Sequence, residues 1–266
     1  MSGPDRSGAP PGLSAPGGLP TVAFLPGNGH VDERLERARA AAAALPAGER
    51  FRIVTAAPNT GASSFDAMLD EVAAAVESAD LCHATGIGGL VLIALRARGL
   101  SAVPAILQGP VLWGLELRTF PKIMRLPLMP KALTLALRTP LAQRRFVSKH
   151  FRAAHPPEFL SAFFSGYRDA RAFERWFEWL TPSLLRELEA QLAGDDGRAR
   201  LADLTVWWGA HDHVVTTEEL RVTERALGHT FPLETFSDWG HYPMIDDPEG
   251  WAREVARALE AARSLR

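Results

Sequence analysis

Short apolar runs alternate with amphipathic stretches over the N-terminal part of the chain. The apolar runs have the length of buried strands, and they occupy residues 21–25, 51–55, 80–83 and 103–107. The stretches between them have helical periodicity and cover about 31–44, 64–77 and 87–98. Strands that alternate with helices form a parallel sheet through right-handed crossovers. The pattern therefore predicts an α/β fold.

The alternation stops between residues 113 and 200. This segment is amphipathic and helical, prolines break it repeatedly, and it contains no strand-like run. Strand patterns return at 204–208 and 231–236, and a terminal helix is expected over about 248–264. Pro232 marks the last strand as an edge strand, because proline cannot donate a ladder hydrogen bond. We predict a mostly parallel sheet of about six strands in a core of residues 21–112 and 201–266, with a helical lid over 113–200.

Residues 1–20 are rich in Gly, Pro and Ser and lack the apolar stretch of a signal peptide, so we expect a disordered tail. The chain also has no apolar run long enough to span a membrane, and a cytoplasmic location follows by default.

Composition narrows the possible partners. The formal net charge of -2 offers no general attraction to nucleic acid or to an anionic membrane, so we expect neither. A single cysteine, Cys82, excludes an intrachain disulfide and a multi-cysteine zinc site. Lysine occurs only at 122, 131 and 149, and the preference for Arg and Ala indicates a bacterial protein from a GC-rich genome. The sequence does not determine the oligomeric state.

Candidate chemistry lies at the predicted strand ends, where open parallel sheets bind ligands. Three segments there carry polar or glycine-rich motifs: 25–29 (LPGNG), 208–212 (WGAHD) and 239–244 (WGHYPM). A fourth, 84–89 (ATGIGG), is a turn of small residues between a strand and a helix.

Together these segments resemble the α/β-hydrolase fold superfamily over nearly all of residues 21–262. The turn at 84–89 is similar to the nucleophile elbow, where the family carries Ser, Cys or Asp, but this chain has Gly86. The resemblance implies that Asp212 is the acid of the triad and His241 the base. It also implies that the N–H groups of Asn28 and Ile87 form an oxyanion hole. The N-terminal antiparallel strands of the family are missing.

Other residues offer weaker readings. Thr85 should point away from the site, and Cys82 lies below it, so neither replaces the nucleophile. His211 and His213 flank Asp212 but lack a third ligand, and we expect no metal and no cofactor. His30 and His83 are expected to be structural.

The aromatic residues of the lid suggest an apolar pocket for a mostly apolar small molecule. Candidate pocket residues share an aromatic side chain on or beside the lid: Trp113, Phe146, Phe163, Tyr167 and Trp176.

Three functions fit these residues. The favoured one is non-hydrolytic acid/base chemistry by a His241–Asp212 dyad, as in a lyase, isomerase, epimerase or cyclase of specialised metabolism. The second is hydrolysis of an ester, thioester or lactone by a water that His241 activates. The third is a catalytically dead protein that binds a small molecule.

Overall fold

The computed structural model describes residues 18–264, so most of the predicted tail lies outside the described residues. Six parallel strands form one sheet, in agreement with the predicted, mostly parallel sheet of about six strands. Their order in the sheet is β2-β1-β3-β4-β5-β6. The strands are short, and the four central ones are almost entirely buried: β1 (Thr21–Leu25), β3 (Leu81–Thr85), β4 (Ala105–Gln108) and β5 (Leu204–Gly209). The outer strands, β2 (Arg52–Thr55) and β6 (Leu233–Phe236), are partly exposed. Strand β6 is at the edge and starts directly after Pro232, which has no N–H to donate.

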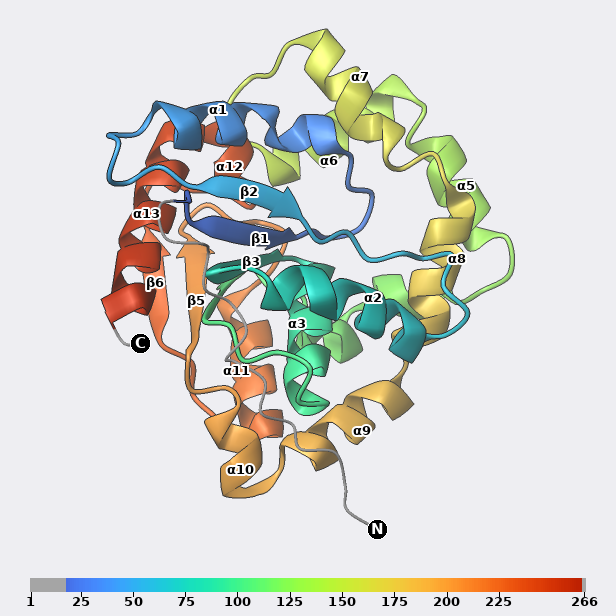
Figure 1. The fold of residues 1–266 in the computed structure, drawn as a ribbon. Coiled ribbons are helices and arrows are strands. Elements are labelled where there is room, and N and C mark those ends of the chain that lie inside the picture. The colour runs from blue at the N-terminus through green and yellow to red at the C-terminus, as the bar shows by residue number, and fades with distance from the viewer. Residues whose placement is uncertain (1–17, 265–266) are drawn as a thin grey trace.

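Helices cover both faces of the sheet (Figure 1). One face packs on α1 (Glu36–Ala44) and α13 (Pro248–Ser264), and the other packs on α2 (Phe65–Glu77), α3 (Ile87–Ala97) and α11 (Thr217–Leu227). Two short elements precede α1 and α13, namely η1 (Asp32–Leu35) and α12 (Pro243–Asp246). Ser64 caps α2 by accepting from the Ala67 N–H. Two hydrophobic cores result, one on each face.

The segment between β4 and β5 is entirely helical in its regular structure. Its elements are η2 (Trp113–Leu117), α4 (Thr119–Met124), α5 (Met129–Ala136), α6 (Pro140–His150), α7 (Pro157–Ser165), α8 (Ala170–Trp179), α9 (Pro182–Leu192) and α10 (Gly194–Ala199). Helix α9 packs on α3 and belongs to the core of the main layer. Figure 1 shows α5, α7 and α8 on the side toward which the arrows of β1 and β2 point. These lid helices therefore stand over the carboxyl ends of strands.

No helix among residues 18–264 is both long and apolar enough to cross a membrane.

Candidate active site

His241 and Asp212 form a buried pair at the carboxyl ends of β5 and β6. His241 Nδ1 lies 2.8 Å from Asp212 Oδ2, and their side chains are only 5% and 0% exposed. Asp212 follows β5 in a tight turn, and its Oδ1 accepts from the Val214 and Val215 N–H groups at 2.7 and 3.1 Å. Both carboxylate oxygens are thus occupied, so the carboxylate is held rigidly against the imidazole.

The environment of Asp212 favours its ionised form. Burial alone would raise the pKa of this carboxyl, but the charge and hydrogen bond of His241 and the two backbone N–H groups outweigh burial and lower it. An ionised Asp212 fixes the proton of neutral His241 on Nδ1. His241 lines a cavity, and its Nε2 makes no hydrogen bond within residues 18–264, so this nitrogen is available to a ligand.

Gly86 occupies the sharp turn between β3 and α3. Its φ of 53° and ψ of -123° lie in a region that L residues adopt only under strain. The turn is packed tightly on its far side, because a Cβ on Gly88 would lie 2.3 Å from the Leu25 carbonyl oxygen. On the near side it is open, since a Cβ on Gly86 would meet only the Gly27 Cα, at 3.8 Å. There is therefore room for a small group directly above Gly86.

The loop after β1 reaches this turn from the neighbouring strand. The Gly27 N–H donates to Thr85 Oγ1 at 3.2 Å, which ties the loop to the end of β3. A Cβ on Gly27 would lie 3.7 Å from the Ile87 nitrogen, so the two loops touch. Ile87 is the first residue of α3, where the helix leaves N–H groups without an internal acceptor. Asn28 and Ile87 both line the same cavity as His241.

That cavity has a volume of about 440 Å³ and lies between the strand ends and the lid. Its floor is made of Gly27, Asn28, Gly86, Ile87 and His241. Its walls are mostly apolar or aromatic side chains of the lid: Phe120, Leu133, Leu137, Phe146, Tyr167, Phe173 and Phe177. The volume and the apolar walls are typical of a site for a small organic molecule.

Comparison with solved structures gives the fold. The chain is similar to an α/β-hydrolase-fold protein from Burkholderia ambifaria, with a TM-score of 0.64, 16% identity and 90% coverage of each chain. It is also similar to a variant haloalkane dehalogenase from Bradyrhizobium elkanii, with a TM-score of 0.61, 16% identity, and coverage of 96% of this chain and 92% of that one. The chain has the α/β-hydrolase fold.

A third match is a membrane phospholipase A, with a TM-score of 0.56, 19% identity, and coverage of 95% of this chain and 82% of that one. No family model matches the chain, and neither does any curated protein. With identities this low, the comparisons speak for the α/β-hydrolase fold and not for a particular reaction.

Three of the five predicted pocket residues lie in the hydrophobic cores and do not line this cavity. Trp113 is 2% exposed and donates its Nε1–H to Glu189 on α9. Trp176 packs in the core on the α3 face, and Phe163 is fully buried in the core on the α1 face. Phe146 and Tyr167 do line the cavity, as predicted.

Sequence reasoning missed His150, at the end of α6, which lines the cavity beside His241. The ring centroids of the two histidines lie 5.6 Å apart, and His150 stacks on Phe146 with a centroid distance of 3.7 Å. Burial, followed by the charge of His241, lowers the pKa of His150 to about 3. The ring is therefore neutral, and its Nδ1 donates to the Phe146 carbonyl oxygen at 2.8 Å. No motif in the sequence distinguishes this residue.

The weaker candidates do not form an alternative site. Burial raises the pKa of the Cys82 thiol to about 12, so this cysteine is not a nucleophile near neutral pH. His83 is fully buried and accepts from Trp251 Nε1–H at 3.1 Å, which is a structural role. Within residues 18–264, no group of three or more His, Cys, Asp or Glu could hold a metal ion.

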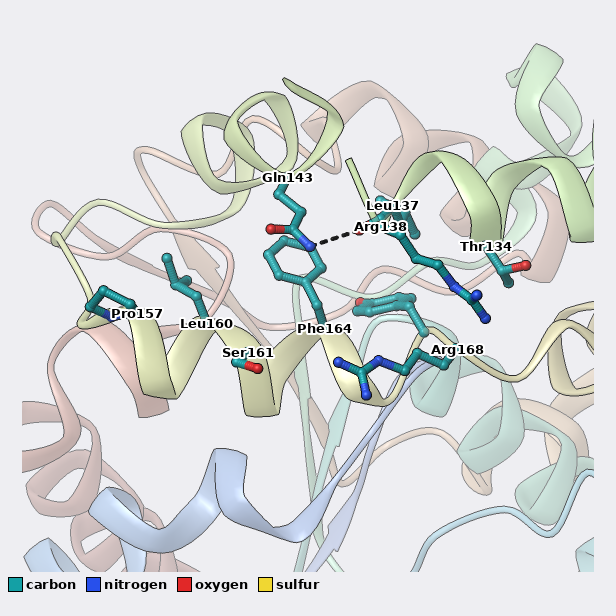
Figure 2. A pocket seen from close by; sticks show the side chains of 10 residues that line it. Thr134, Leu137, Arg138, Gln143, Pro157, Leu160, Ser161, Phe164 and Arg168 are labelled. Carbon is teal, nitrogen blue, oxygen red and sulfur yellow. Dashed lines mark hydrogen bonds between the residues drawn. The ribbon is translucent and has the colours of Figure 1, made fainter. Parts of the chain in front are cut away.

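A second cavity of about 290 Å³ lies inside the lid (Figure 2). It shares Leu137 and Tyr167 with the first cavity but contains neither His241 nor Asp212. Figure 2 shows Leu160 and Phe164 of α7 facing Gln143, whose Nε2 donates to the Leu137 carbonyl oxygen at 2.9 Å. Of these two cavities, only the first is lined by His241.

Proposed function

We propose that the protein is an enzyme in which His241, oriented by Asp212, acts as a general base on a small organic substrate without a covalent acyl-enzyme. One observation carries this proposal. A buried His–Asp pair opens into an apolar cavity at the same turn where Gly86 offers no attacking atom. Ligand binding alone does not require a carboxylate behind an imidazole that lines the cavity, whereas a general base does.

The proposed reaction begins with proton transfer to His241 Nε2. Asp212 stabilises the imidazolium that forms, and it is itself unprotonated because its pKa is lowered. The negative charge that develops on a substrate oxygen is stabilised by the N–H groups of Asn28 and Ile87. His241 then returns the proton to another position of the substrate or to a leaving group, which gives an isomerase, epimerase, lyase or cyclase reaction.

The absence of a side chain at Gly86 supports a substrate that approaches the imidazole directly. A Cβ built on Gly86 would lie 3.8 Å from the Gly27 Cα, the nearest heavy atom beyond its two chain neighbours, so there is free space at this position. In this proposal, an oxygen or carbon atom of the substrate occupies that space. The lid supplies apolar and aromatic walls. Among the cavity residues, Arg118 and Lys149 are the only Lys or Arg, and there is no Asp or Glu. We therefore propose a mostly apolar substrate, such as a specialised metabolite.

Proton abstraction is tested by solvent exchange. A panel of ketones and β-keto esters is incubated with the protein in deuterated water, and deuterium at carbon is followed by NMR. We expect exchange with the wild type, loss of about 100-fold or more in His241→Ala, and no change in the exposed control His211→Ala. A ligand from the panel that binds tightly, emerges unchanged and binds His241→Ala equally well would overturn both enzyme proposals.

Hydrolysis is the second candidate, and the open space at Gly86 also supports it. Gly86 and His241 line the same cavity, so in this proposal a water molecule held there is activated by His241 as a nucleophile. The two candidates differ in ester kinetics. Water-mediated hydrolysis would give steady turnover of p-nitrophenyl esters by the wild type with no burst, whereas proton-transfer chemistry gives none.

The Gly86→Ser variant tests the turn itself. A Cβ fits there sterically, so we expect a folded variant that shows a burst of p-nitrophenol from acylation of the new serine. The positive φ should cost about 1–2 kcal/mol of stability. A folded variant without a burst would contradict the assignment of Gly86 to the nucleophile position.

A further inference from the structure

Exposed apolar side chains are concentrated on the lid. Nine large apolar side chains are exposed among the described residues, and seven of them fall within residues 117–141. We call these seven the lid patch: Leu117, Phe120, Ile123, Leu126, Leu128, Leu135 and Leu141. Soluble surfaces carry scattered apolar residues, but a concentration of this kind marks a surface that contacts something else.

The tip of the patch is the connection between α4 and α5. Leu126, Pro127 and Leu128 are consecutive and all exposed, and the Leu128 side chain is 69% exposed. Leu128 is also the one residue other than glycine with a positive φ among residues 18–264, at 68°. Strain of this kind is expected where function needs a particular side chain in a particular place. Here it holds a leucine out into solvent.

The segment that carries the patch contains charged residues of one sign only. Residues 117–157 contain nine of the 29 Lys and Arg of the chain and none of the 31 Asp and Glu. This segment therefore carries +9, and the rest of the chain carries -11. Six of the nine are exposed and make no side-chain hydrogen bond or ion pair within the described part of the chain: Lys122, Lys131, Arg138, Arg144, Arg145 and Lys149.

We propose that the lid patch docks on an anionic lipid bilayer, with the Leu126–Leu128 tip in the interface and the unpaired cations around it on the lipid headgroups. Apolar side chains surrounded by Lys and Arg are the combination that binds such a surface. The opposite charge of the rest of the molecule turns the lid toward the bilayer. The net charge of -2 suggests no attraction to an anionic membrane. It is, however, the sum of a positive lid segment and a negative remainder of the chain.

The docking surface adjoins the active-site cavity. Phe120 belongs to the patch, is 46% exposed and also lines that cavity. Lys149, one of the six unpaired cations, lines the cavity as well. A bilayer on the patch thus lies next to the edge of the site. The docking proposal does not depend on which reaction His241 performs, and its test measures binding alone.

The test is sedimentation of the full chain with lipid vesicles. We expect binding to vesicles of phosphatidylcholine mixed with phosphatidylglycerol, little binding to phosphatidylcholine alone, and weakening by added salt. The double variants Leu126→Asn/Leu128→Asn and Lys122→Gln/Lys131→Gln should each reduce binding about tenfold or more. Asparagine tolerates the positive φ at 128, and Leu135→Asn is a second apolar variant in a regular helix.

Matched controls remove similar groups from the body of the molecule. Leu233→Asn removes an exposed leucine from β6, and Arg186→Gln/Arg253→Gln removes two exposed arginines from α9 and α13. Both controls should bind like the wild type. Equal affinity for the two kinds of vesicle, or wild-type binding by the lid variants, would overturn the proposal. So would a dimer that the leucine variants dissociate in the absence of vesicle binding, since a second copy would then cover the patch.

Discussion

Gly109 shows how narrowly the backbone encloses the dyad. It follows β4 with a φ of 47°, and a Cβ on it would lie 2.7 Å from Asp212 Oδ2 and 3.1 Å from His241 Nδ1. Those two atoms are the ones joined by the dyad hydrogen bond, and neither can move without losing it. A glycine is required there by contact as well as by backbone conformation.

We predict that Gly109→Ala impairs the dyad. The methyl group should push Asp212 and His241 apart and lower His241-dependent activity about 100-fold, since small displacements of catalytic groups have effects of that size. The control is Gly99→Ala, which has a similar φ of 65° but no atom within 4 Å of the place that its methyl group would occupy. Both variants should lose about 1 kcal/mol of stability from backbone strain. Equal activity of the two variants would contradict the prediction.

At the scale of elements, Asp246 of α12 joins the lid to the core. Its carboxylate accepts from the Arg152 and Ala153 N–H groups at 3.0 and 3.3 Å, and it lies 2.9 Å from His155 Nε2. The side chains of His155 and Asp246 are 1% and 5% exposed. One buried carboxylate therefore holds the connection between α6 and α7, only a few residues from His241.

We predict that Asp246→Ala loosens this connection. Ala153 and the buried side chain of His155 would lose their acceptor, and so would the more exposed Arg152 N–H, so the free energy of unfolding should fall by about 2–3 kcal/mol. Hydrogen exchange at Arg152 and Ala153 should accelerate. Asp238→Ala is the control, because the Asp238 side chain is 87% exposed and its Oδ1 lies 3.9 Å from Arg152 Nη1. The Asp238 carbonyl oxygen, which accepts from Arg152 Nη1, remains in this variant. Unchanged exchange at both amides in Asp246→Ala would show that the lid is held elsewhere.

At the scale of the whole molecule, buried neutral histidines make stability depend on pH. Burial lowers the pKa of His83 to about 3, from 6.5 in an exposed histidine, and burial and nearby Arg34 lower that of His30 to about 4. Together with His150, they take up protons only when the chain unfolds. Stability should therefore be full above pH 6.5 and decline as pH falls toward 3.

We predict that His83→Gln flattens this dependence. Glutamine can still accept from Trp251 Nε1–H, but it takes up no proton on unfolding. Between about pH 6 and 4, the slope of unfolding free energy against pH should fall by about 1.4 kcal/mol per pH unit. Urea denaturation at a series of pH values measures the slope. The exposed control His211→Gln should retain the wild-type slope, and an equal slope in His83→Gln would refute the prediction.

The sequence by itself determined the order and type of the elements in the sheet. Apolar runs at strand length and amphipathic stretches between them are local signals, and they carried through to six parallel strands. It also indicated Asp212, His241 and Gly86, because their segments follow predicted strands and resemble motifs of the α/β-hydrolase family. Parallel strands bring such positions to the same edge of the sheet, whatever the details of packing.

Only the tertiary structure decided which lid residues face the cavity and which fill the core. The lid aromatics look alike in sequence, since both roles require an apolar side chain, yet Phe146 lines the cavity and Phe163 is fully buried. His150, Gly109 and Asp246 depend on contacts between segments far apart in the chain. Periodicity shows that a residue belongs to an apolar face, but the partner of that face is set by long-range packing.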